Sequence, residues 1–261
     1  MSKSPSVISR VIDILNLFSE DKVHISIGDI STTLNLSVAS TYRYANDLQQ
    51  AGLLLRSSSG HYRLGPKIIE LEYLIQSYDP VLKASRDLME RLAAFTGCNV
   101  LMCNFYDATI VNMLHIAGKY PIKLSYTKGM RMPLFKGAQA HIMLAYMNKR
   151  RLRRLYDASI ADPALRADVE AIGADWKSFN KSLKAIRSAG YFISCDQLDP
   201  DVTGIATPVF GENDEIVGSL VLIHSTSRAP DMARDRLAAL VSQSAGEISK
   251  RLRFEQTPAG A

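Results

Sequence analysis

The stretch from Ser26 to Leu48 constrains the fold most, because it predicts two short helices separated by a tight turn. Ser26, followed by Asp29 three residues later, is a capping signal for the first helix. The apolar residues that follow share one helical face: Ile27, Ile30 and Leu34. Ser37 can accept a hydrogen bond from the backbone of a new first turn, so a second helix begins there. The stretch therefore predicts a helix-turn-helix.

The second helix has two distinct faces. The packed face repeats at helical spacing: Thr41, Tyr44, Ala45 and Leu48. The opposite face has the same spacing: Ala39, Tyr42, Arg43 and Asn46. This second face suits a major groove, where Arg can read guanine and Asn can read adenine. The alternative is the solvated face of an ordinary helical domain, and for an isolated helix pair the two interpretations are about equally good.

A short hairpin after this helix favours DNA binding. The helix ends near Gly52, and two strands, Leu53–Arg56 and Tyr62–Leu64, flank a Ser/Gly turn. A helix-turn-helix followed by such a hairpin is a winged arrangement, whose tip can reach the DNA backbone or minor groove. The predicted DNA-contacting residues are Ser37, Ala39, Ser40, Tyr42, Arg43, Asn46, Arg56, His61 and Arg63.

Overall basicity adds little to this prediction. The 261-residue chain has a formal net charge of +5, but its acidic and basic side chains balance within residues 1–76. Much of the excess lies in the run Lys149–Arg154, which by default is a solvated helix face. Phosphate contacts depend on which face carries the cations. The cluster of basic side chains between residues 40 and 67 (Arg43, Arg56, Arg63 and Lys67) is therefore stronger evidence for DNA binding than the net charge of the whole chain.

The length suits two domains, and the pattern predicts a boundary at Asp79–Pro80. We expect a winged helix-turn-helix domain over 1–65, a linker helix over 66–79 and a second domain over 80–261. The first domain should open with a helix over Ser6–Glu20 whose packed residues are Ile8, Val11, Ile12, Leu15 and Phe18. In the second domain the predicted helices are 81–95, 137–148, 149–156, 177–189 and 234–254. The predicted strands there are 99–106, 109–117, 122–126, 191–195, 204–210 and 216–224, with turns at Asp107–Ala108 and Gly211–Asp214. This order predicts an α+β fold with a mainly antiparallel sheet.

Several classes of protein are disfavoured. No run of about 18 apolar residues predicts a membrane span, and the start lacks the apolar core of a signal peptide, so we expect a cytoplasmic protein. No nucleotide-binding or hydrolase fingerprint is present, and neither an enzyme nor a cofactor is expected. Three cysteines without a Cys-x-x-Cys pair indicate neither disulfides nor zinc. A thiol redox sensor or enzyme using Cys98, Cys103 and Cys195 stays open as an alternative, as does a protein-interaction adaptor.

The chain resembles IclR-type bacterial transcriptional regulators along essentially its full length. The N-terminal motifs are Leu36-Ser37, Ser40-Thr41, Arg43, Leu48, Gly52-Leu53-Leu54 and Tyr62-Arg63-Leu64-Gly65. The C-terminal motifs are Gly129–Leu134, Leu144-Ala145, Ala189-Gly190-Tyr191 and Gly204–Phe210. The resemblance implies a homodimer or tetramer that binds operator double-stranded DNA, with dimer contacts mainly between the DNA-binding domains. It also implies a GAF-like C-terminal domain that binds a small organic effector, without a metal, and alters operator binding.

By the same resemblance, the effector pocket falls on Tyr126, Phe135, Ala138, Gln139, Ser194, Cys195, Gly204, Val221 and Ile223. The chain departs from the family where His is usual (Phe135), where Gly-Lys is usual (Ala140-His141), and where an acidic residue is usual (Gln197). Positions that bear hydroxyls or a thiol in members binding very small keto acids are Gly204, Val221 and Ile223. A less polar pocket fits a more apolar ligand. The resulting hypothesis is a repressor of catabolic genes that responds to an aromatic or alkyl carboxylate held by backbone amides near Ala138 and Gln139.

Overall fold

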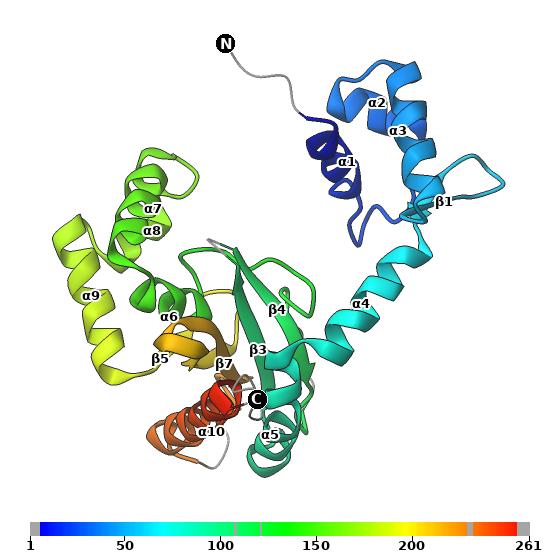
Figure 1. Ribbon diagram of the computed structural model, residues 1–261. Coiled ribbons are helices and arrows are strands. Elements are labelled where there is room, and N and C mark those ends of the chain that lie inside the picture. The colour runs from blue at the N-terminus through cyan, green and yellow to red at the C-terminus, as the bar shows by residue number, and fades with distance from the viewer. Residues whose placement is uncertain (1–5, 107–108, 121, 229–231, 255–261) are drawn as a thin grey trace, which may run out of the picture. The chain divides into compact units, whose positions relative to one another are not determined.

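The computed structural model describes residues 6–106, 109–120, 122–228 and 232–254. The chain divides into two compact units, one up to Asp79 and the other from Pro80 (Figure 1). The first unit contains the helices α1 (Val7–Leu15), α2 (Ile27–Leu34), α3 (Val38–Gln50) and α4 (Pro66–Tyr78) and the strands β1 (Leu54–Arg56) and β2 (Tyr62–Leu64). The two strands pair antiparallel, so the predicted winged helix-turn-helix is confirmed.

Local hydrogen bonds start both helices of the motif. The Ser26 hydroxyl accepts a hydrogen bond from the Asp29 amide at 3.1 Å, and the Asp29 carboxylate accepts one from the Ser26 amide at 2.8 Å. This reciprocal capping box lowers the pKa of Asp29, chiefly through the Ser26 backbone donor. Asn35 ends α2 in the left-handed conformation at φ 51°, and the Ser37 hydroxyl then caps α3 by accepting from the Ser40 amide at 3.2 Å.

The small core of this unit does not include two residues of α1 that were predicted to be packed. Its fully buried members include Ile14, Ile30 and Tyr62. On α1 the predicted packed residues Ile8 and Ile12 are instead 75% and 47% exposed. The helix is also shorter than predicted, because it ends at Leu15 and the next residues form a turn closed by pairing of Ser19 with Lys22. The apolar stripe of α1 is therefore wide enough to serve the core and leave a second, exposed strip.

The second unit is an α+β fold built on one sheet (Figure 1). Its helices are α5 (Pro80–Thr96), α6 (Ala138–Tyr146), α7 (Lys149–Ala161), α8 (Arg166–Ile172), α9 (Trp176–Ala189) and α10 (Arg234–Phe254), with a 3₁₀ turn η1 (Glu212–Asp214). Its strands are β3 (Asn99–Tyr106), β4 (Thr109–Ile116), β5 (Phe192–Cys195), β6 (Val202–Phe210) and β7 (Ile216–Ser225). They lie in the order β4-β3-β7-β6-β5, and every pair is antiparallel.

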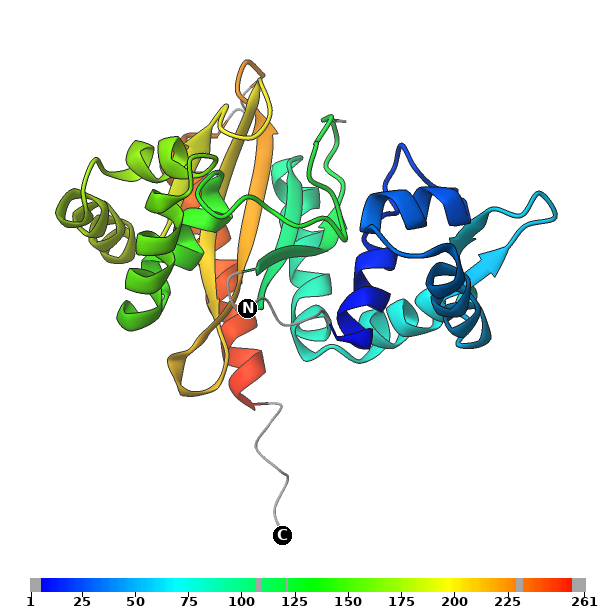
Figure 2. The ribbon, with the colours of Figure 1, turned by 90° about the horizontal axis from the view of Figure 1, so that it is seen from above.

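Helices cover both faces of this sheet, which is why its central strands are apolar on both sides. Alternate side chains such as Met102 and Leu222 pack with α5 and α10. The intervening side chains, such as Leu101, Val221 and Ile223, pack with α6, α7 and α9 on the other face (Figure 2). The sheet thus separates two hydrophobic cores. At the end of the sheet that contains Val202 and Ile223, the loop residues Leu124, Leu198 and Asp199 lie beside the strands.

Two further predictions differ from the structure. No strand forms over 122–126, because the Ser125 amide donates to the Asp199 carboxylate at 3.0 Å rather than to a neighbouring strand. Helix α8 was not predicted, since its seven residues carry a single buried apolar side chain, Val169. The predicted turn at Asp107–Ala108 lies outside the described residues. Among the described helices, none is both long and apolar enough to cross a membrane.

Candidate functional site

Helix α3 presents a continuous exposed face. Ala39, Tyr42, Arg43 and Asn46 are all exposed, and Tyr42 retains 42% of its accessible surface. The opposite side is fixed in the core by four buried residues: Thr41, Tyr44, Ala45 and Leu48. Both faces are therefore placed as the periodicity predicts. The helix is anchored on one side and offers an aromatic ring, a guanidinium and an amide on the other.

The remaining predicted contacts border this face. At the start of α3, Ser37 is exposed and Ser40 is half-buried, and both hydroxyls take part in the cap. The Arg43 guanidinium lies 5.2 Å from the centre of the Tyr44 ring. Such stacking leaves the edge of the guanidinium available for bidentate hydrogen bonds to a base or phosphate.

The hairpin turn between β1 and β2 is held by its own hydrogen bonds. The Ser57 amide donates to the His61 carbonyl at 2.8 Å, and the Gly60 amide donates to the Ser57 carbonyl at 3.0 Å. Arg56, His61 and Arg63 are all exposed. Arg56 stacks over Tyr62 at 5.9 Å, while the Tyr62 ring itself is fully buried. The wing therefore presents exposed cations from a turn with a fixed shape.

The second candidate site is a small cavity on the α6 face of the sheet. Its walls are Leu101, Leu124, Tyr126, Met132, Gln139, Ser194, Leu198, Asp199, Val202, Gly204, Val221 and Ile223. Six of the nine predicted effector residues are among them: Tyr126, Gln139, Ser194, Gly204, Val221 and Ile223. The cavity holds only about 30 Å³, which is room for about two water molecules. The walls are mainly apolar, with the Gln139 amide and the Ser194 hydroxyl as neutral polar groups and the Asp199 carboxylate as a charged group.

Two loop segments cover this cavity, and sequence reasoning missed most of their residues. Residues 124–132, here called the lid, contribute Leu124 and Met132, while residues 196–201 contribute Leu198 and Asp199. The Ser125–Asp199 hydrogen bond ties the two segments together. Irregular segments carry no periodic pattern, so the sequence held no signal for these contacts.

A fully buried asparagine on β4 anchors the lid. The Asn112 side-chain amide donates to the Tyr126 carbonyl at 2.9 Å, and its backbone carbonyl accepts from the Gly129 amide at 2.7 Å. Its side-chain oxygen also accepts from the Cys103 thiol at 2.8 Å. Asn112 therefore fixes the lid to the sheet beside the cavity.

The N-terminus of α6 forms another part of the wall. Gly137 adopts φ 82°, and a Cβ atom there would lie 2.6 Å from the Leu198 side chain, so only glycine fits. The Gln197 side chain accepts from the Gly137 amide at 3.0 Å, and the His141 ring hydrogen-bonds to the Gly137 carbonyl at 2.9 Å. The next amides, of Ala138 and Gln139, open the helix with donors that have no partner within the helix.

Three predicted effector residues do not line the cavity. Phe135 is 3% exposed and packs into the core on the α6 face. Ala138 is fully buried, 3.7 Å from where a Gly204 Cβ would be, so it lies beside the cavity. Cys195 follows Ser194 on β5 and so points to the opposite face, where its sulfur accepts from the Thr203 hydroxyl at 3.5 Å.

The cysteines do not form a redox pair. Cys98 belongs to the core on the α5 and α10 face and Cys103 to the core on the other face. Burial raises the pKa of both thiols, that of Cys103 to about 12, so neither forms a thiolate readily. Cys195 is free and exposed. Among the described residues, no three His, Cys, Asp or Glu side chains gather closely enough to hold a metal ion.

Family comparisons match both units. The family described as "IclR helix-turn-helix domain" matches residues 7–58, and "Bacterial transcriptional regulator IclR C-terminal" matches residues 74–250. The chain belongs to the IclR family. It is thus a DNA-binding transcriptional regulator of the bacterial IclR type, and the predicted resemblance is confirmed.

Individual IclR relatives are distant but cover the whole chain. The HTH-type transcriptional regulator XynR of Escherichia coli is 24% identical over 95% of this chain and 97% of its own length. The HTH-type transcriptional repressor AllR of Escherichia coli is 22% identical over 98% of this chain and 93% of its own length. An IclR regulator of Alicyclobacillus acidocaldarius has a TM-score of 0.78, with 18% identity over 95% and 99%. An IclR homolog from Microbacterium hydrocarbonoxydans, solved with 4-hydroxybenzoate, has a TM-score of 0.76, with 18% identity over 95% and 99%.

The departures from the IclR pattern have structural roles here. Gln197, in place of the usual acidic residue, bonds the amide of Gly137. His141 stacks on Phe192 with ring centres 4.2 Å apart, and burial lowers its pKa, so it stays neutral. These two substitutions place uncharged side chains at the start of α6, while Lys136, directly before Gly137, pairs with Asp168 at 2.8 Å.

Proposed function

We propose that this IclR regulator binds a small carboxylic acid with an aromatic or alkyl body in the cavity between the lid and the sheet, and that binding changes its operator affinity. The mainly apolar wall, which includes Leu101 and Val221, is the observation that supports this ligand class most directly. Its one carboxylate, that of Asp199, already accepts from the Ser125 amide. The amides of Ala138 and Gln139 at the start of α6 are the groups that would receive the carboxylate.

The small volume of the cavity makes the lid part of the mechanism. Because about 30 Å³ cannot contain an aromatic acid, a ligand must displace lid side chains such as Leu124 and Met132. Ligand binding then favours a conformation with a different lid, and such a differential affinity is what a switch requires. Helix α4, which joins the two units along the chain, is the connection through which we expect the change to reach α3.

Isothermal titration of the full chain tests the ligand class. The panel contains benzoates, phenylacetates and the short keto acids glyoxylate and pyruvate, and operator binding is measured with each by fluorescence anisotropy. We expect the tightest binding from an aromatic or longer alkyl acid, as in the relative solved with 4-hydroxybenzoate. Tighter binding of glyoxylate or pyruvate than of every aromatic acid would overturn this assignment.

The regulator is further proposed to act as a homodimer that represses catabolic genes. Exposed apolar side chains on α1 and α4, including Ile8, Ile69 and Leu74 (75%, 71% and 51% exposed), provide a surface for a second copy. Light scattering of Ile69→Glu should show loss of the dimer.

The name of the AllR relative, a transcriptional repressor, supports repression. In vitro transcription from an operator template should fall when the wild-type protein is added. A monomeric wild type, or a rise in transcription, would contradict these assignments.

A further inference from the structure

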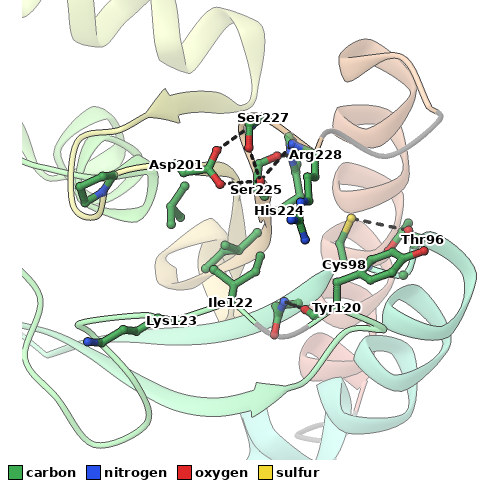
Figure 3. Close-up of a pocket in the computed structure, with 15 residues that line it drawn as sticks. Thr96, Cys98, Tyr120, Ile122, Lys123, Asp201, His224, Ser225, Ser227 and Arg228 are labelled. Atoms are coloured by element: carbon green, nitrogen blue, oxygen red, sulfur yellow. Dashed lines mark hydrogen bonds between the residues drawn. The ribbon is translucent and has the colours of Figure 1, made fainter.

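A cleft in the C-terminal unit lies at the end of the sheet and is distinct from the proposed effector cavity. It has a volume of about 700 Å³, within the usual range for small-molecule sites. It lies where β3 and β6 begin and β7 ends, and Tyr120, Ile122 and Lys123 border it (Figure 3). Val202 and Ile223 line both this cleft and the effector cavity.

A buried histidine supplies a recognition group. His224 is 4% exposed, and its Nε2 atom has no hydrogen-bond partner among the described residues. Its Nδ1 lies 2.8 Å from the Ser225 carbonyl oxygen, which can only accept, so Nδ1 carries the proton. In the neutral ring Nε2 is therefore a bare acceptor. In the view of Figure 3 the His224 side chain lies between those of Ile122 and Cys98, and its Nε2 atom is covered by neighbouring side chains.

Two other polar side chains that line the cleft, those of Asp201 and Asn99, already have hydrogen-bond partners. The Asp201 carboxylate accepts from the Ser225 hydroxyl and the Ser227 amide, both at 2.7 Å. The Asn99 side chain bonds to the His115 ring at 3.0 Å and to the Tyr120 carbonyl at 3.4 Å. Buried acceptors without partners are costly, so a donor that reaches His224 gains more than one that competes for these groups.

The exposed side of the cleft carries two cations, Lys123 and Arg228, and one carboxylate, Asp201, which interacts with Arg228. Arg228 and Lys123 line it and are exposed, and the Arg228 amide donates to the Ser225 hydroxyl at 3.0 Å, which fixes the turn that bears it. Ile122 and Val202 supply apolar wall between these cations and His224. A matching ligand has a hydroxyl at one end, an apolar body and an anionic group at the other end.

We infer that this cleft is a second small-molecule site, which takes a hydroxylated organic acid whose hydroxyl donates to His224 Nε2 and whose carboxylate faces Arg228 and Lys123. Because Nε2 is covered by neighbouring side chains, a ligand reaches it by displacing side chains that line the cleft, such as that of Ile122. Because Val202 and Ile223 line both sites, the two sites share part of a wall. A ligand in one site can therefore change the ligand affinity of the other. The second site does not depend on the effector cavity being used.

The test uses the full chain carrying Gly204→Val, which fills the effector cavity, since a Cβ there already lies 3.4 to 3.8 Å from Ser194, Ala138 and Val221. Isothermal titration compares 4-hydroxyphenylacetate with phenylacetate, which differ only in the hydroxyl. We expect the hydroxylated acid to bind about tenfold more tightly. His224→Phe should remove this difference, His224→Gln should keep part of it because its carbonyl accepts, and His24→Phe should not affect it. Thermal unfolding confirms that each variant is folded.

Nitrogen NMR of the histidine rings gives a readout independent of affinity. The Nε2 resonance of His224, assigned by its absence in His224→Phe, should shift when 4-hydroxyphenylacetate is added in the Gly204→Val background. Equal binding of the two acids, unchanged binding in His224→Phe, or a resonance that does not move would overturn the second site. Binding that Gly204→Val itself abolishes would place the acid in the effector cavity alone, which also overturns the second site but leaves the proposed function intact.

Discussion

Arg43 is the side chain on which the proposed operator contact most depends, because it is exposed on α3 and positioned by stacking on Tyr44. Arg43→Ala should weaken operator binding by about 1 to 3 kcal/mol if the guanidinium pairs with a guanine. Fluorescence anisotropy with a labelled operator duplex at one fixed salt concentration measures this loss.

The matched control for Arg43 is Arg150→Ala, which removes an equal charge from an exposed position on α7. It should leave operator affinity nearly unchanged. Leu48→Ala is a contrasting variant, because Leu48 is 2% exposed and its loss should reduce stability by about 2 to 5 kcal/mol. Equal operator binding by Arg43→Ala and wild type would mean that α3 presents a different face to DNA.

His141 makes the stability of the C-terminal unit depend on pH. Burial lowers its pKa in the folded protein, whereas in the unfolded chain it takes up a proton near pH 6.5. Below that pH the unfolded chain therefore binds more protons, and the free energy of unfolding falls as the solution is acidified. The urea midpoint should decrease from pH 7.5 to pH 5.5.

His141→Phe should make this decrease smaller without removing it, because burial also lowers the pKa of His115. Phenylalanine keeps the stack on Phe192 but loses the hydrogen bond to the Gly137 carbonyl, so the slope of the urea midpoint against pH, and not its absolute value, is compared. Parallel pH profiles for variant and wild type would show that His141 does not carry the effect.

At the scale of elements, prediction succeeded where local chemistry decides the structure. The helix-turn-helix could be placed from the sequence because its helix ends depend on neighbouring residues alone. These are the caps at Ser26 and Ser37 and the positive φ of 73° at Gly52. The segment 122–126 has the apolar composition of a strand, but Asp199, 74 positions away from Ser125, holds it as part of a covering loop. Periodicity contains no information about such a distant partner.

The lid gives an element-scale prediction. Replacing Asn112 by leucine removes the side-chain hydrogen bonds to the Tyr126 and Thr127 carbonyls, at 2.9 and 3.4 Å. Losing buried hydrogen bonds costs about 1 to 3 kcal/mol, so the lid should open more often. Hydrogen exchange should be at least several-fold faster at the Gly129 and Met132 amides than in wild type.

Asn104→Leu is the control for Asn112, since it also removes a buried asparagine, but one whose amide donates to the Tyr106 hydroxyl at 3.3 Å rather than to the lid. Its exchange at Gly129 and Met132 should match wild type. If both variants accelerated exchange equally, general destabilisation and not lid anchoring would be the cause.

At the scale of the whole molecule, the antiparallel sheet and most of the order of elements were predicted from the sequence, apart from the strand over 122–126 and helix α8. The candidate pocket was predicted only in part. Strand alternation places Val221 and Ile223 on the pocket face, yet the same alternation excludes Cys195, which lies one position beyond Ser194. Phe135 was assigned by its place in a motif, and burial in the core took it out of the cavity wall. Which loop covers a pocket depends on tertiary packing that no local pattern records.

Reciprocal coupling between the two units is the most demanding prediction. If an acid in the effector cavity changes operator affinity by some factor, operator DNA must change the affinity for that acid by the same factor, because both describe one free-energy difference. For a released repressor we expect both affinities to fall by about 5- to 150-fold. Isothermal titration of the acid, with and without saturating operator duplex, gives one factor, and anisotropy with and without saturating acid gives the other.

Gly204→Val should abolish the response to acid while retaining operator affinity, since it fills the cavity far along the chain from α3. An acid that bound tightly but with the same affinity in both titrations would be a bystander, and the regulator would need another signal.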